Sequence, residues 1–229
     1  MHRSWILAKR EPRLSRAKII QTTVVAILMG MCFWQVSDGM SSDDPAKRTQ
    51  SVADVTGAVY FMTVVQMYLN FQPTVIVFQG EKPIYTRERD SGMYDIWTYA
   101  TTKLIAEIPI MLFVPFLFLI ITYFSIGLQD KFSNFVAFYF MLMFMIQAAT
   151  AMGYALSSSF NHATTAVAFA PIVNMPLTLL AGYMINLKDI FQKRPQRGIA
   201  WFQYLSPVRY GFAGLSVVEF SSLTDIQEA

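Results

Sequence analysis

The stretch that decides the fold is residues 55–78, VTGAVYFMTVVQMYLNFQPTVIVF, which contains 24 residues and no charged side chain. About 20 apolar residues in an α-helix cross the roughly 30 Å hydrocarbon core of a bilayer. The stretch lacks the strict period-2 alternation of a transmembrane β-strand. Because backbone polar groups in lipid must be satisfied within the segment, it predicts a transmembrane helix.

Four further apolar runs have a comparable length, and they predict spans at residues 19–36, 98–126, 132–156 and 163–187. The composition agrees, because 54% of the 229 residues are hydrophobic, only 14% are charged and the mean hydropathy is +0.39. An ordinary soluble domain carries roughly 25% charged residues. The sequence therefore predicts an all-α polytopic membrane protein, with a bundle of five transmembrane helices over residues 19–187.

The segment 188–229 follows this bundle and has a different pattern. Its apolar part, residues 198–220, is divided near Pro207 by Arg209 into uncharged pieces of 11 and 9 residues, which are too short to span. We therefore expect an external loop with short re-entrant or interfacial helices, and a kinked sixth span is the alternative. The aromatic anchors at headgroup level would be Trp201, Tyr204 and Tyr210.

Lys and Arg are distributed unevenly between the two sides of the predicted bundle. Ten lie before the first span or between the second and third: Arg3, Lys9, Arg10, Arg13, Arg16, Lys18, Lys82, Arg87, Arg89 and Lys103. The opposite short loops carry three: Lys47, Arg48 and Lys131. The positive-inside rule then predicts a cytoplasmic N-terminus. Residues 1–18 are typical of an amphipathic interfacial helix, and a solvated basic leader is the alternative.

The densest group of charges lies in residues 85–109, YTRERDSGMYDIWTYATTKLIAEIP, which begins in the predicted cytoplasmic loop 79–97. The runs 108–129, 132–160 and 163–187 contain no acid, base or histidine of the kind that ion-coupled carriers usually need. No G-x-x-x-x-G-K-[ST], H-E-x-x-H or Cys-x-x-Cys motif occurs. We therefore expect no catalytic or metal site and no enzyme activity from this chain alone, and energy would have to enter from outside through the charged loop.

The spans contain uncharged polar side chains and several prolines. The polar residues are Gln66, Asn70, Gln72, Gln147 and Asn174, and the prolines are Pro73, Pro109, Pro115, Pro171 and Pro176. They could line a cavity, or they could form ordinary hydrogen bonds between helices. Aromatic residues recur at helical spacing in the second span, where they form either a wall for a lipophilic ligand or ordinary packing: Tyr60, Phe61, Tyr68 and Phe71.

Four motifs in order carry a family resemblance: RERDSGMY, YATTKLIAEIP, GYMINL and WFQYLSPVRYGFAGLSVVEF. From about Arg10 to Phe220 the chain resembles the membrane domain of the G subfamily (white/brown type) of ABC transporters, which are type-2 exporter permeases. The resemblance implies that residues 1–18 are a connecting helix and that the bundle exports lipids, sterols or other lipophilic compounds, driven by ATP. The implied partners are the bilayer, a nucleotide-binding domain that holds ATP and Mg²⁺, a second membrane domain as homo- or heterodimer, and the substrate, with no nucleic acid.

The resemblance also implies roles for individual residues. The residues implied to couple this chain to the ATPase domain are Arg87, Glu88, Arg89, Asp90, Gly92 and Tyr94, with Glu88 as the ion-pairing residue. The substrate cavity falls on Gln66, Leu69, Tyr68, Phe71, Pro171, Asn174 and Met175. The gate or plug above it falls on Tyr183 and Met184.

Family members also have an ATPase domain and a sixth span, which this sequence lacks, so we interpret it as a fragment of a half- or full-size transporter or an incomplete gene model. Other classes stay open, namely an ion-coupled carrier or channel and a non-transporting scaffold or regulatory subunit. Polysaccharide-export permeases are the alternative within transport. The sequence leaves open the substrate and whether the membrane is the plasma membrane or that of an organelle.

Overall fold

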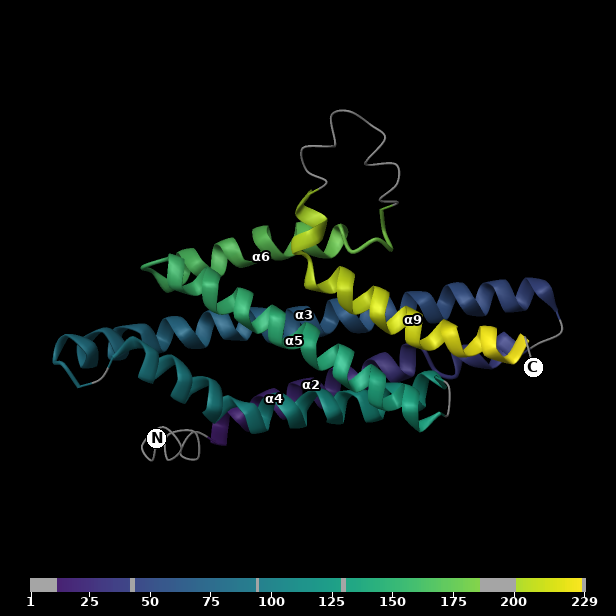
Figure 1. Ribbon diagram of the computed structural model, residues 1–229, viewed down its shortest axis with the longest axis horizontal. Coiled ribbons are helices and arrows are strands. Elements are labelled where there is room, and N and C mark those ends of the chain that lie inside the picture. Colours follow the sequence, from purple (N-terminus) through teal and green to yellow (C-terminus); the bar gives the residue numbers. More distant parts are fainter. Residues whose placement is uncertain (1–11, 42–43, 94, 129–130, 186–200, 228–229) are drawn as a thin grey trace.

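The computed structural model describes residues 12–41, 44–93, 95–128, 131–185 and 201–227. Every regular element within these ranges is a helix. The α-helices are α2 (Pro12–Cys32), α3 (Pro45–Asp90), α4 (Ile96–Ile126), α5 (Phe132–Ser159), α6 (Ala163–Leu179) and α9 (Pro207–Gln227), and the 3₁₀-helices are η1 (Val36–Ser41) and η3 (Trp201–Leu205). The long helices run beside one another in an elongated bundle (Figure 1).

Each of the five predicted spans overlaps one of these helices. Among the described residues, α2, α3, α4 and α5 lie in segments long and apolar enough to cross a membrane. The helix α6 is apolar but has only 17 residues and ends at Leu179, whereas the sequence predicted a span to residue 187. Gly182, with φ of 101°, follows in a left-handed conformation that ends the helical path. The fold is that of an all-α polytopic membrane protein.

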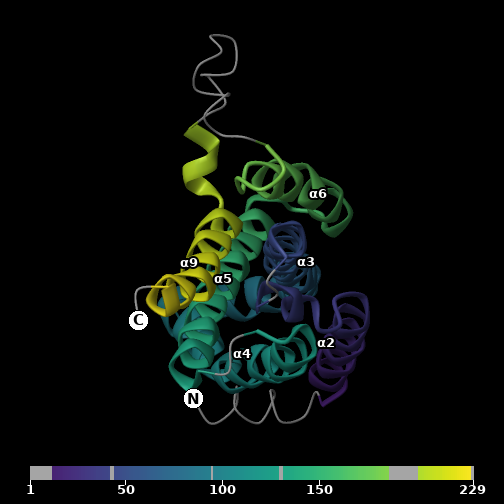
Figure 2. The same ribbon diagram turned by 90° about the vertical axis from the view of Figure 1, so that its right-hand side faces the viewer.

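The helix α3 is the central element of the bundle. Its 46 residues are about 69 Å long at 1.5 Å per residue, more than twice the roughly 30 Å hydrocarbon thickness. It begins at Pro45, where the missing N–H has no helical partner to lose. Figure 2 shows α3 between α5, α6 and α9 on one side and α2 and α4 on the other. Movement of α3 would therefore affect every other long helix.

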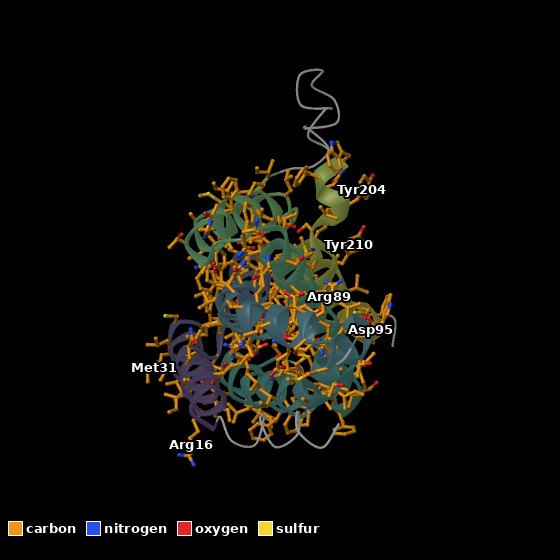
Figure 3. The ribbon with its side chains drawn as sticks, turned by 90° about the vertical axis from the view of Figure 1, so that its left-hand side faces the viewer. Arg16, Met31, Arg89, Asp95, Tyr204 and Tyr210 are labelled. Carbon is orange, nitrogen blue, oxygen red and sulfur yellow. The ribbon has the colours of Figure 1, made fainter. Side chains whose placement is uncertain are left out.

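The core consists of two apolar clusters that share α3. One joins α2, α3, α4, α5 and α9 around Met62, Phe118 and Phe138, and the other joins α3, α5, α6 and α9 around Phe71 and Leu177. Apolar side chains also cover the outside of α2, where Met31 points away from the bundle (Figure 3). Such an outward apolar surface fits contact with lipid.

Close packing between α3 and α5 depends on small residues at every fourth position of α5. Ala149, Gly153 and Ser157 are buried against α3. A Cβ atom on Gly153 would lie 3.1 Å from the carbonyl oxygen of Phe71, and the Ser157 hydroxyl donates to the carbonyl of Val75 at 3.0 Å. This is the small-xxx-small pattern by which helices approach closely in membranes.

The segment after α6 differs from the predicted short helices. The predicted division near Pro207 corresponds to the boundary between η3, which ends at Leu205, and α9, which begins at Pro207. Arg209 does not interrupt the helix, because α9 continues without a break for 21 residues. Ser206 precedes the helix, and its hydroxyl accepts from the Arg209 N–H at 3.3 Å and donates to the Leu177 carbonyl at 2.6 Å. A proline is well tolerated at a helix start, which explains the difference. Tyr204 and Tyr210 point outward (Figure 3).

The N-terminal boundary differs too. The predicted connecting helix 1–18 and the predicted first span have no break between them, because α2 runs continuously from Pro12 to Cys32. Residues 1–11 lie outside the described residues. At its other end α2 lies close to α4, since a Cβ atom on Gly30 would come within 2.7 Å of the Ser125 hydroxyl.

Candidate functional site: a charged helical hairpin and its base

The α3–α4 hairpin, which we define as residues 79–107, projects beyond the ends of α5 and α6 (Figure 1). Contacts between side chains hold its two arms together. The rings of Tyr85 and Tyr99 pack with centroids 4.4 Å apart, and the Tyr99 hydroxyl donates to Glu81 Oε2 at 3.0 Å. Lys103 forms an ion pair with the same oxygen. The hairpin is therefore braced as one unit.

The same lysine connects the hairpin to the next helix. Its side chain is only 12% exposed, and its Nζ lies 3.9 Å from Glu107 Oε1 and 5.4 Å from the ring centroids of both Phe78 and Tyr154. The hydroxyl of Tyr154 lies 2.7 and 2.6 Å from the two oxygens of Glu107, to which it donates. Burying a charge is tolerated only with close partners, and these residues supply them for Lys103. The network joins α3, α4 and α5.

Other side chains of α3 bind the end of α5. Gln79 Nε2 donates to the carbonyls of Ser157 at 2.5 Å and Phe160 at 3.0 Å. Lys82 Nζ donates to the carbonyls of Ser158 at 3.1 Å and Phe160 at 2.6 Å. The last carbonyls of a helix have no partner within the helix, and a cation there is favoured by the helix dipole. The base of the hairpin thus also fixes the turn from α5 to α6.

Four of the predicted coupling residues, Arg87, Glu88, Arg89 and Asp90, lie in the helical end of α3 and not in a loop. The predicted loop 79–97 is corrected, because α3 remains helical as far as Asp90 and α4 already begins at Ile96. Polar residues such as Glu88 and Arg89 favour helix when nothing interrupts them. The residues in the last turn of α3 are Arg87, Glu88, Arg89 and Asp90, with Glu88 half-buried and the others exposed.

The turn itself is short. Gly92 has φ of 73°, a conformation that favours glycine, and the Asp95 side chain accepts from the Ile96 N–H at 2.8 Å as α4 begins. Arg89 and Asp95 mark this tip in Figure 3. Tyr94, also predicted to couple, lies outside the described residues.

The predicted cavity residues divide into two groups. Gln66, Phe71 and Asn174 are buried within the chain. Tyr68, Pro171 and Met175 are exposed, and Leu69 is half-buried. Gln66 Oε1 accepts from Asn70 Nδ2 at 3.1 Å, whereas both amide atoms of Asn174 have no hydrogen-bond partner among the described residues. The exposed group lies on the outer faces of α3 and α6, so a second surface is needed to enclose it.

The predicted gate residue Tyr183 belongs to an aromatic cluster. Its ring stacks on that of Tyr60 at 4.7 Å and packs edge-on against Phe212 at 5.8 Å. The Tyr60 hydroxyl donates to the Thr178 carbonyl at 3.1 Å. The cluster therefore joins α3, the segment after α6 and α9. Met184, the other predicted gate residue, is exposed and is not part of it.

Sequence reasoning noted Lys103 and Glu107 as charges but gave them no role. Their i,i+4 spacing in an apolar helix is a signal that such a pair must be neutralised by partners. No sequence signal identifies Glu81 or Tyr154 as those partners. No group of three or more His, Cys, Asp or Glu that could hold a metal ion occurs in the described part of the chain.

Comparison with known proteins agrees with this architecture. A family model described as ABC-2 type transporter matches residues 1–220. Protein white of Ceratitis capitata and protein white of Drosophila melanogaster are each 30% identical over 222 residues, which cover 96% of this chain and 30% of the relative. The broad substrate specificity ATP-binding cassette transporter ABCG2 of Sus scrofa is 27% identical over 210 residues, 91% of this chain and 30% of the relative.

The chain belongs to the ABC-2 type transporter family, and its resemblance to the membrane domain of the G subfamily is confirmed. It spans about 30% of the length of these curated relatives.

Proposed function

We propose that this chain is the transmembrane part of an ATP-driven exporter of lipids, sterols or other lipophilic compounds. A nucleotide-binding domain that holds ATP and Mg²⁺ and a second membrane domain, identical or different, would complete the transporter. We assign no described residue of this chain to ATP or magnesium. Family membership supports the class, and the hairpin supports the mechanism.

The observation that carries the mechanism is the network at the base of the hairpin. A partner domain that moves the tip, residues 87–94, would move α3 and α4 together because Glu81 and Lys103 brace them. The movement would reach α5 through the bond from Tyr154 to Glu107, and the start of α6 through Gln79 and Lys82. ATP-driven closure can thus be transmitted from one exposed helix end to the whole bundle.

Charge reversal at the hairpin tip tests this coupling. In the full-length transporter, Glu88→Lys should reduce substrate export about tenfold or more while ATP hydrolysis falls much less, because the half-buried carboxylate proposed to pair with a basic group of the nucleotide-binding domain would become a cation that this group repels. Both rates are measured on the same reconstituted protein.

Asp44→Lys provides the matched control, since Asp44 adjoins the opposite end of the same helix and is exposed. The control should export at the wild-type rate. Normal coupled export by Glu88→Lys would contradict the proposed role of the tip.

For the substrate path, we place the exposed faces of α3 and α6 against the second membrane domain. Tyr68, Pro171 and Met175 would contact substrate there, with Leu69 beside them. The buried members of the predicted set, Gln66, Phe71 and Asn174, would support this wall from behind. Tyr183, locked by Tyr60 and Phe212, would close the path at its far end together with Met184.

The orientation that fits this mechanism has the N-terminus and the hairpin tip in the cytoplasm, in the plasma membrane or an organelle membrane. Single cysteines test it after Cys32 is replaced. A membrane-impermeant thiol reagent applied to sealed cells should label a cysteine at Tyr204 and leave one at Ser91 unlabelled, and the reverse pattern would contradict the orientation.

A further inference from the structure

A groove of about 570 Å³ lies where the hairpin meets the turn between α5 and α6. Its volume is within the range of small-molecule sites, roughly 300–1,000 Å³. One face of α3 and the start of α6 form its walls. The lining residues are Gln79, Lys82, Pro83, Thr86, Arg87, Asp90, Asn161, His162 and Ala163.

The charge of the groove is predominantly positive. Lys82 and Arg87 contribute two cations and His162 an imidazole, against the single carboxylate of Asp90. Lys82 uses two of its three N–H donors on the Ser158 and Phe160 carbonyls, so its cation is held at the wall of the groove. Arg87 is exposed and has a guanidinium fork that matches a phosphate or carboxylate.

The groove lies where an amphiphile would need it. Lys82 is four residues, or about 6 Å, beyond Phe78, the last residue of the predicted span 55–78, which places it near headgroup level. The groove-lining face of α3 continues at helical spacing through Ile76 to Tyr68, and both are exposed. A cationic groove is thus continuous with an apolar helix face.

We infer that this groove binds the anionic head of an amphiphile, with a phosphate, sulfate or carboxylate close to Arg87 and Lys82. The source is either an anionic phospholipid of the adjacent leaflet or a soluble amphiphilic compound. The site goes beyond the proposed export function and does not depend on coupling to ATP, since it rests on the groove and its charges.

Binding of a defined probe tests the site. The full-length protein in a neutral detergent is titrated against a dansyl-labelled alkyl phosphate and against the same alkyl chain with a neutral glycerol head, and fluorescence anisotropy is recorded without ATP. The phosphate probe should bind about tenfold more tightly, as expected for one charge-assisted hydrogen-bonded pair.

Two substitutions should move this affinity in opposite directions. Arg87→Gln should weaken binding of the phosphate probe about tenfold, and Asp90→Asn should strengthen it about threefold by removing a like charge. Arg89→Gln, two residues further along α3 and absent from the lining, should change the affinity less than about twofold. A general loss of structure would weaken binding in all three variants, so it cannot explain weaker binding in one, stronger binding in another and unchanged binding in the third.

Nanodiscs identify the source of the ligand. If phosphatidylserine in phosphatidylcholine nanodiscs displaces the probe from the wild-type protein, the ligand is a lipid head, and if it does not, the ligand is a soluble amphiphile. Equal binding of the two probes, or equal effects of Arg87→Gln and Arg89→Gln, would overturn the inference. Export is scored on Glu88→Lys with ATP, and this site is scored on Arg87→Gln and Asp90→Asn by probe binding without ATP, so failure of the export proposal and failure of this site are distinguishable.

Discussion

Tyr154 shows how a single hydroxyl can join two helices of this bundle. Its hydroxyl donates to Glu107, and its ring faces Lys103. Hydrogen bonds to charged groups contribute about 1.5–3 kcal/mol, so Tyr154→Phe should lower the thermal unfolding midpoint of the detergent-purified protein clearly. It should also reduce substrate-stimulated ATP hydrolysis in the full transporter, because α5 would no longer follow α4.

A matched tyrosine lies on the same helix. The Tyr139 hydroxyl donates to the neutral carbonyl of Leu112 at 3.1 Å. Tyr139→Phe makes the same chemical change away from the charged network, and a neutral bond contributes about 0.5–1.5 kcal/mol. If Tyr154→Phe and Tyr139→Phe lower the unfolding midpoint by the same amount and have the same effect on ATP hydrolysis, the bond from Tyr154 to Glu107 does not couple α5 to α4.

Ser206 holds the segment after α6 onto the bundle. It caps α9 through the Arg209 N–H and binds the Leu177 carbonyl of α6. Removing a helix cap costs about 0.5–2 kcal/mol, and the buried Leu177 carbonyl would lose its partner as well. Ser206→Ala should therefore lower the unfolding midpoint and raise protease sensitivity in this segment, whereas Ser206→Thr should retain most of the stability. Wild-type behaviour of Ser206→Ala would show that the cap is dispensable.

Among the helices, the contact of α5 with α3 is the one most sensitive to side-chain size. A Cβ on Gly153 would meet the Phe71 carbonyl and Thr74, and a backbone carbonyl cannot move aside easily. Overpacking typically costs about 1–3 kcal/mol, so Gly153→Leu should lower the unfolding midpoint strongly.

Gly80 is the control for this contact. A Cβ there would meet nothing within 4 Å, so Gly80→Ala should raise the midpoint slightly by improving helix propensity, by about 0.5–1 kcal/mol. A tolerated Gly153→Leu substitution would mean that α3 and α5 are packed less closely than the structure shows.

The existence of the helices could be predicted from sequence because apolar runs without charge have few alternatives in lipid. Their ends could not be predicted equally well. The charges of residues 87–90 appeared to end the second span in a loop, but charge only ends the membrane part of a helix, and α3 continues to Asp90. Pro207 does divide the last segment, since η3 ends just before it, but the piece that follows is one helix of 21 residues that Arg209 does not interrupt.

The position of candidate site residues in the fold could be predicted only where they belong to one continuous sequence motif. RERDSGMY correctly located residues at the turn from α3 to α4. Partners that come from distant helices, such as Glu81 with Lys103 or Tyr60 with Tyr183, depend on how the helices pack, and no local pattern encodes that. The exposure of individual side chains could not be predicted either. Tyr68 and Phe71 are only three residues apart in α3, yet Tyr68 is exposed and Phe71 is buried.

At the scale of the whole molecule, α3 connects the two ends of the proposed mechanism. Its hairpin end carries the brace to α4 and the caps on α5, and its other half carries Tyr60, which packs on the proposed gate residue Tyr183. This single helix is about 69 Å long and contains Pro73 and Pro83 between those two ends. In the proposed mechanism, α3 is thus the element that connects the proposed coupling residues to the proposed gate residue.

The face formed by α3 and α6 should behave differently from the lipid-facing surface if it lines the substrate path. Met175 on α6 is 60% exposed, and Ile20 on α2 is 63% exposed, so a tryptophan at either position avoids the core. In the full transporter, Met175→Trp should reduce export about tenfold or more while basal ATP hydrolysis persists, because the large ring would fill the path between the two membrane domains. Ile20→Trp should leave export within about twofold of wild type, since a ring at the membrane surface is well accommodated. Equal export by the two variants, measured as substrate accumulation in inside-out vesicles, would place the path elsewhere.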